Sequence, residues 1–109
     1  MTVKELCKAC DFTPVVDQNL DNDVSSVYSC DLLSWVVGRA RLNAALVTVM
    51  TNVNVIAVAS MADLSCIVLT EGVKLDEIAL NKAIDTGIPV LSSKLDTFKT
   101  CALMSKYID

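Results

Sequence analysis

The sequence predicts an α/β fold, a three-layer sandwich in which helices cover a mostly parallel sheet of four or five strands. Two runs, Ala45 to Met50 and Cys66 to Leu69, are apolar at nearly every position, as in parallel strands that are buried on both faces. The segment between them has helical three- and four-residue spacing at Val53, Ile56, Ala57 and Ser60. Strand, helix and strand in that order indicate a parallel crossover unit.

The N-terminal elements follow from local signals. Thr2 and Glu5 have the spacing of a capping box, which predicts a helix from Val3 to about Asp11. Pro14 forbids a helix, so the valines after it predict a brief strand, and a turn-like stretch follows over residues 17–23. A strand is expected over residues 24–30. Asp31 then suits the N-cap of a helix whose predicted apolar face is Leu32, Leu33, Val36, Val37 and Ala40.

The C-terminal elements are punctuated by turn and cap residues. Thr70 to Gly72 predicts a turn before a helix over residues 76–86, which Gly87 and Pro89 end. A short buried strand is expected over residues 88–91, and a second capping box of Ser93 and Asp96 predicts the terminal helix. The side chains expected to face inward from these two helices are Ile78, Ala79, Ala83, Ile84, Leu95, Phe98, Ala102 and Ile108.

Length and composition predict one domain over residues 1–109 with a dense aliphatic core. Hydrophobic residues make up 53% of the chain and aromatic residues only 5%, which excludes disorder. A net charge of −4 with scattered basic residues argues against nucleic-acid binding.

The uncharged run over residues 42–62 contains three asparagines, so it is interpreted as soluble core and not as a membrane span. The start of the chain has no secretion-signal pattern, which predicts a cytoplasmic location.

Cys7 and Cys10 form a C-x-x-C pattern of the kind used for redox exchange or metal capture. They also lie on the apolar stripe of the first predicted helix, where cysteine behaves as a small buried hydrophobe. The preferred interpretation is core packing without a cofactor. The alternatives are redox chemistry and a zinc or iron–sulfur site shared with a partner or a second copy. Because the chain has no histidine, the further ligands of such a site would come from Cys30, Cys66 or Cys101.

A small-ligand site is predicted at the carboxyl ends of the strands, where open α/β sheets bind ligands. No lysine or arginine is expected to join it, and the same polar residues also suit helix capping. The candidate residues are Ser25, Ser26, Tyr28, Ser29, Asp31, Thr51, Asn52, Asn54, Thr70, Gly72, Ser92 and Ser93.

Trp35 is the only tryptophan, and it lies beside the apolar face of its predicted helix. Tryptophan is enriched at the centre of interfaces, so Trp35 is a candidate self-association residue. The alternative is a partly buried core aromatic.

An enzymatic function is not expected, because the chain contains no phosphate loop, nucleophile elbow or dinucleotide fingerprint.

Four separated segments carry a family resemblance in order along the chain: residues 28–34 (YSCDLLS), 51–59 (TNVNVIAVA), 70–72 (TEG) and 87–91 (GIPVL). Together they resemble the DRTGG domain family. The naming motif D-R-x-V-T-G-G corresponds to Asp21 to Val27, DNDVSSV, in which the basic residue and both glycines are replaced. If those glycines let the backbone approach an anion, their replacement here either abolishes that site or reshapes it.

The resemblance implies a regulatory or assembly module similar to the N-terminal domain of HPr kinase and to Mur ligase domains. Members of the family also occur between paired CBS modules of regulated pyrophosphatases, where they contribute to dimer contacts, and as small proteins encoded near iron-only hydrogenases. The resemblance thus implies a homodimer with a small, nucleotide-like ligand and a hydrogenase-related protein partner.

Overall fold

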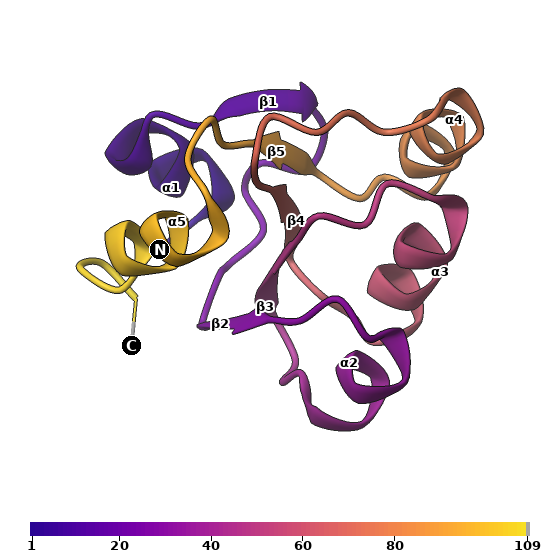
Figure 1. Ribbon diagram of the computed structural model, residues 1–109, viewed down its shortest axis with the longest axis horizontal. Coiled ribbons are helices and arrows are strands. Elements are labelled where there is room, and N and C mark those ends of the chain that lie inside the picture. Colours follow the sequence, from indigo (N-terminus) through magenta and orange to yellow (C-terminus); the bar gives the residue numbers. More distant parts are fainter. Residues whose placement is uncertain (109) are drawn as a thin grey trace.

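The computed structural model describes residues 1–108, which form five strands and five helices in alternating layers (Figure 1). The strands form one sheet in the order β1-β5-β4-β3-β2, with β1 antiparallel to β5 and the other neighbours parallel. The predicted α/β sandwich with a mostly parallel sheet is therefore confirmed. The elements are α1 (Val3–Cys10), β1 (Thr13–Val16), β2 (Ser26–Ser29), α2 (Leu33–Arg39), β3 (Ala44–Thr48), α3 (Val53–Met61), β4 (Cys66–Leu69), α4 (Glu77–Thr86), β5 (Val90–Ser92) and α5 (Thr97–Met104).

Helices α2, α3 and α4 cover one face of the sheet, and α1 and α5 cover the other (Figure 1). Successive residues of β3 and β4 alternate between the two cores, as the pleat requires. Leu46 and Ile67 point to the three-helix side, whereas Val47 and Val68 point to the two-helix side. All four are inaccessible to solvent. Burying each such side chain stabilises the fold by about 1.5–3 kcal/mol.

Most helix ends carry the cap residues that the sequence indicates. The Thr2 hydroxyl accepts a hydrogen bond from the Glu5 amide at 3.1 Å, and the Glu5 carboxylate accepts one from the Thr2 amide at 2.8 Å. These bonds lower the pKa of Glu5 below its ordinary value. Asp76 caps α4, and Gly87 ends that helix in the left-handed region with φ of 76°. The predicted N-terminal capping box and the glycine C-cap are thus confirmed.

Two predicted caps are wrong. The carboxylate of Asp31 accepts hydrogen bonds from Thr48 at the end of β3 and from Val49 just after it. The N-cap of α2 is Leu32, which has no side-chain cap bond. Asp96, three residues after Ser93, caps α5 by accepting from the Lys99 amide at 2.8 Å. Ser93 is instead buried beneath that helix. In both places, the side chain that local spacing assigns to a helix cap forms a tertiary contact instead.

Several predicted inward positions are exposed, because each short helix packs only a narrow stripe on the sheet. Ala79 and Ala83 bring α4 close to its neighbours, which leaves Ile78 71% and Ile84 45% exposed. The buried residues of α3 are Val55, Ile56, Val58 and Ala59. Because this helix is apolar on nearly every side, its sequence does not indicate which face is buried. The other predicted inward residues that prove to be exposed are Leu32, Val37, Leu95, Phe98 and Ala102, and two of the residues that show the helical spacing of α3, Ala57 and Ser60, are exposed as well.

Two strand predictions also change. The strand expected over residues 24–30 is only Ser26–Ser29, and β1 begins two residues before the predicted Val15 and Val16. Strand β1 lies against β5 with Thr13 opposite Ser92, which brings the start of the chain to one edge of the sheet.

Within residues 1–108, no helix is long and apolar enough to cross a bilayer.

Candidate functional site

We define the carboxyl edge as the last residues of β2, β3, β4 and β5 together with the segments that follow them up to the first turn of the next helix. It contains nine of the twelve predicted ligand residues: Ser29, Asp31, Thr51, Asn52, Asn54, Thr70, Gly72, Ser92 and Ser93. Ser25 and Ser26 lie at the opposite, amino end of β2, where the Ser25 hydroxyl donates to the Leu42 carbonyl at 3.2 Å. Tyr28 lies within β2. The prediction that these three residues lie with the others at the carboxyl end is therefore wrong, because β2 runs from Ser26 to Ser29 and only Ser29 is at that end of the strand.

On the β2 and β3 side, the polar groups of the carboxyl edge are engaged with one another. One carboxylate oxygen of Asp31 accepts from the Thr48 hydroxyl at 2.7 Å and from the Val49 amide at 3.0 Å. The Asn52 side chain accepts from the Asn54 amide at 3.0 Å and so caps α3. These contacts tie adjacent loops together and leave few free donors for a ligand on this side.

On the β4 and β5 side, two hydroxyl pairs fasten α5 to the sheet. Thr70 and Thr97 join their hydroxyls at 2.7 Å, and Ser93 and Thr100 join theirs at 2.9 Å. The Ser93 hydroxyl also accepts from the Leu95 amide at 3.2 Å. Thr70 and Thr100 are inaccessible to solvent, and Ser93 nearly so. Thr70 and Ser93 are therefore structural contacts beneath the surface of the edge.

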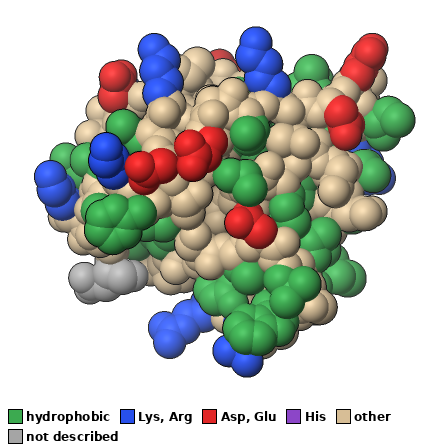
Figure 2. Space-filling model, viewed as in Figure 1, with side chains coloured by type: hydrophobic (Ala, Val, Ile, Leu, Met, Phe, Trp, Pro, Cys, Tyr) green, Lys and Arg blue, Asp and Glu red, His purple; other side chains and the backbone are tan. Residues whose placement is uncertain are grey.

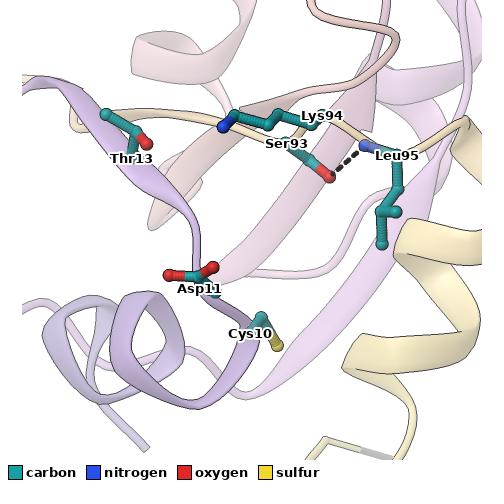
Figure 3. A pocket seen from close by; sticks show the side chains of 6 residues that line it. All are labelled: Cys10, Asp11, Thr13, Ser93, Lys94 and Leu95. Atoms are coloured by element: carbon teal, nitrogen blue, oxygen red, sulfur yellow. Dashed lines mark hydrogen bonds between the residues drawn. The ribbon is translucent and has the colours of Figure 1, made fainter.

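Two hollows open at the carboxyl edge beside β1, and we call them together the β1-side groove. The first, about 380 Å³, has a mainly apolar wall and one cation, and is lined by Thr13, Val15, Gly72, Val73, Lys74, Leu75, Leu80 and Ser92. The second, about 370 Å³, shares Thr13 with the first and is lined also by Cys10, Asp11, Ser93, Lys94 and Leu95. Figure 3 shows Lys94 extending toward Thr13, with Asp11 at the end of α1 facing the same hollow.

The groove contains residues that the sequence does not indicate, because the antiparallel pairing of β1 brings Thr13 beside Ser92. Lys74 and Lys94 join the candidate residues Gly72 and Ser92, so the prediction that no lysine or arginine lies at this site is wrong. Each lysine follows the end of a parallel strand within a few residues, and that spacing is the available signal. Neither lysine forms an ion pair with another residue in the range 1–108.

Cys7 and Cys10 are buried, unpaired thiols in the core between α1, α5 and the sheet. Burial raises the pKa of both thiols, and for Cys7 the nearby Asp17 adds to the increase. Both thiols are therefore held in the protonated form, which neither binds metal nor attacks disulfides well. In the described part of the chain no three or more His, Cys, Asp or Glu side chains form a metal-binding group. This donor set does not fit a complete zinc or iron–sulfur site, and the shared site stays a prediction.

Trp35 lies on the outer side of α2 and is 49% exposed. The Arg39 guanidinium carbon lies 4.0 Å from the centre of its ring, a cation–π contact. Leu32, at the N-cap of α2 and three residues before Trp35, is exposed on the same side, and Val37 is exposed on the other side of the helix. Figure 2 shows hydrophobic side chains gathered over α2 with basic side chains beside them. Trp35 is thus a surface residue within an apolar patch and not a core aromatic.

The segment Asp21 to Val27 lies away from the carboxyl edge and is held by the chain itself. Asn22 accepts from the Val3 amide through its backbone and donates through its side chain to the Ser65 carbonyl at 3.2 Å. Ser65 in turn donates its hydroxyl to the Asp23 carbonyl. These contacts join the start of α1 to the loop before β4, so the segment has a structural role at the amino end of the sheet.

Residues 18–107 match the family model described as DRTGG domain. The chain belongs to the DRTGG domain family. No curated protein matches this DRTGG domain. Among solved structures, it is similar to the CBS and DRTGG domains of the regulatory region of a Clostridium perfringens pyrophosphatase, complexed with the activator diadenosine tetraphosphate. The TM-score is 0.70 at 10% sequence identity, over 94% of this chain and 45% of that one. The likeness establishes the fold, and the DRTGG domain spans less than half of that regulatory region.

Proposed function

We propose that this DRTGG domain is a non-enzymatic regulatory module that binds a nucleotide-like ligand in the β1-side groove. The observation that carries the proposal is the groove itself, because it joins an apolar hollow to two lysines at the carboxyl edge of a parallel sheet. Ligands of open α/β sheets bind at this edge. The activator in the similar pyrophosphatase regulatory region is a dinucleotide, which supports the same chemical class here.

The lining of the groove suits the separate parts of a nucleotide. Val15, Val73 and Leu80 provide an apolar wall for a base. Lys74 and Lys94 provide ammonium groups for phosphate oxygens, and Asp11 provides an acceptor for a ribose hydroxyl. Each hollow is within the size range of small-molecule sites, which begins at about 300 Å³. The ligand would thus contact both the β1 strand and the loops after β4 and β5.

A regulatory role without catalysis is supported by the chemistry of the groove. The chain has no histidine, the usual general base near neutral pH. The Cys10 thiol at the groove is buried with a raised pKa, which makes it a poor nucleophile. Binding, and not bond breaking, is the activity that these side chains support.

Calorimetric titration of the DRTGG domain with ADP and with diadenosine tetraphosphate tests this proposal. We expect saturable binding of at least one of them. The double variant Lys74→Ala/Lys94→Ala should weaken it by about tenfold or more, because each lysine loses a charge-assisted contact. The matched control Lys82→Ala/Lys106→Ala removes two exposed lysines from outside the groove and should bind normally. If both double variants weakened binding equally, the effect would come from the change in net charge, and the proposed site would be contradicted.

We also propose that the module forms a homodimer through the apolar patch over α2. Trp35 and Leu32, three residues apart, are each about half exposed on one side of α2, and aromatic residues are enriched at interface centres. Sedimentation velocity over a range of concentrations tests this. Trp35→Ala should shift the chain toward monomer, whereas Phe98→Ala, which removes an 81% exposed aromatic from α5, should not. A monomer at all concentrations would contradict the proposal.

The protein partner that we propose is a hydrogenase-related protein in the cytoplasm. The family resemblance supports this partner. Biolayer interferometry of the purified DRTGG domain against a purified iron-only hydrogenase tests it, and we expect saturable binding. Absence of binding at micromolar concentrations would contradict a direct contact.

A further inference from the structure

A separate hollow lies at the other edge of the sheet, beside the edge strand β2. It has a volume of about 310 Å³ and is lined by Ser26, Val27, Tyr28, Arg39 and Arg41. Strand β2 is at the far end of the sheet from β1, with three strands between them. The hollow is therefore distinct from the β1-side groove, and an occupant of one would not contact the other.

Two guanidinium groups meet at this hollow in a chain whose net charge is −4. Neither Arg39 nor Arg41 forms an ion pair with another residue of the described range 1–108. Their charges are therefore not neutralised by a carboxylate of that part of the chain. Guanidinium groups donate planar pairs of hydrogen bonds that match phosphate oxygens.

Arg39 is held in place by its stack on Trp35, with 4.0 Å between the guanidinium carbon and the ring centre. A stacked guanidinium keeps its N–H groups in its own plane, so they stay available as donors at its edge. Because the contact with Trp35 already restricts the rotamers of Arg39, less side-chain entropy is lost when an anion binds to it. An anion that binds in the hollow would also change the surroundings of the single tryptophan.

Two hydroxyl groups complete the lining. Ser26 and Tyr28 are two residues apart on β2, so their side chains project from the same face of the strand. Both residues are partly buried. The hydrogen bonds among residues 1–108 do not engage either hydroxyl, unlike that of Ser25, which donates to the Leu42 carbonyl. A hydroxyl can donate to a phosphate oxygen, so each adds to the same recognition chemistry.

We propose that Arg39 and Arg41, with the hydroxyls of Ser26 and Tyr28, form an anion site that binds the phosphate group of a small phosphorylated molecule. The site is independent of the proposed nucleotide groove. Its chemistry accepts a free phosphate, a pyrophosphate or a phosphate monoester. The volume of the hollow is close to the lower end of the small-ligand range, which favours a small phosphorylated compound over a large one.

Trp35 fluorescence provides the test, because an anion that engages Arg39 changes the stack on the indole ring. The full chain is titrated with inorganic phosphate, pyrophosphate and ribose 5-phosphate, none of which carries an absorbing base. Sodium chloride at matched ionic strength provides the screening control. We expect a saturable change in emission with at least one phosphate compound and no saturable change with chloride. The relative response to the three compounds distinguishes a free-phosphate site from a monoester site.

Matched variants locate the response. Arg41→Ala removes an exposed guanidinium and keeps both Trp35 and the Arg39 that lies over its ring, so it should raise the dissociation constant by about tenfold or more. Arg41→Lys keeps the charge but loses the planar donor pair, so the dissociation constant should rise by less than it does in Arg41→Ala. The control Lys82→Ala/Lys106→Ala removes two exposed lysines that line neither hollow of the groove nor the β2 hollow, and it should respond like the unchanged chain. No saturable response to any phosphate compound, the same response to chloride, or equal loss in the lysine variant would overturn the anion site, whatever the outcome at the groove.

Discussion

Asp31 offers the sharpest test of how the carboxyl edge is held together. Its carboxylate accepts from the buried Thr48 hydroxyl at 2.7 Å and from the Val49 amide at 3.0 Å. A hydrogen bond to a charged group contributes about 1.5–3 kcal/mol, and an exposed carboxylate belongs at the lower end of that range. Because the two bonds share one oxygen, we expect Asp31→Ala to lower the free energy of unfolding by about 2–3 kcal/mol. At about 4 °C per kcal/mol for a domain of this size, the melting temperature should fall by about 8–12 °C.

Urea denaturation followed by far-ultraviolet circular dichroism measures this change. Asp31→Asn separates the two interpretations of the residue, because asparagine caps helices as well as aspartate does. If Asp31 only capped α2, Asp31→Asn would be neutral. If Asp31 bridges two strand ends, losing the charge should remove about half of the stabilisation. Asp85→Ala, at an exposed position on α4, is the control and should stay within about 0.5 kcal/mol of the unchanged chain. An Asp31→Ala variant as stable as that control would refute the reasoning.

Two further predictions concern backbone and thiol positions. Gly87→Ala should destabilise the fold by about 1–2 kcal/mol in urea denaturation, because φ is +76° and the new Cβ would lie 2.7 Å from the Asn19 side-chain nitrogen. Gly38→Ala, in α2 with open space around it, should instead be neutral or slightly stabilising, and equal losses at both glycines would contradict the conformational argument. Burial raises the pKa of the Cys66 thiol, so the unfolded chain releases its proton first and stability should fall as pH rises above about 8.5. Cys66→Ala should reduce that slope in denaturation measured between about pH 8 and 10, and an unchanged slope would count against this thiol as its source.

The strand pattern was the part of the fold that could be predicted best. The runs that became β3 and β4 are apolar on both faces because both faces are buried, and that pattern is visible in the residues themselves. The Thr2 and Glu5 box and the Gly87 cap were predictable for a similar reason, since their partners lie within a few residues.

Tertiary contacts decided the rest. Asp31 and Ser93 have the sequence context of helix caps, but each bonds to a residue on another element or across a loop. The β1-side groove depends on the antiparallel pairing that sets Thr13 opposite Ser92. No local pattern encodes that pairing, so Lys74 and Lys94 could not be assigned to one site from spacing alone. Likewise, no local pattern indicates that Arg39 and Arg41 lie beside β2, because the packing of α2 on the sheet decides where the end of that helix lies.

Mapping a nucleotide onto the DRTGG domain is the most direct test of the proposed function. A titration of ¹⁵N-labelled chain with ADP, followed by amide chemical-shift changes in NMR spectra, reports the contacts residue by residue. The account predicts that the largest changes fall on Thr13, on residues 72–75 and on residues 92–95, and that they saturate together. Saturating changes confined to another surface, or no saturable change at millimolar ADP, would contradict the nucleotide groove.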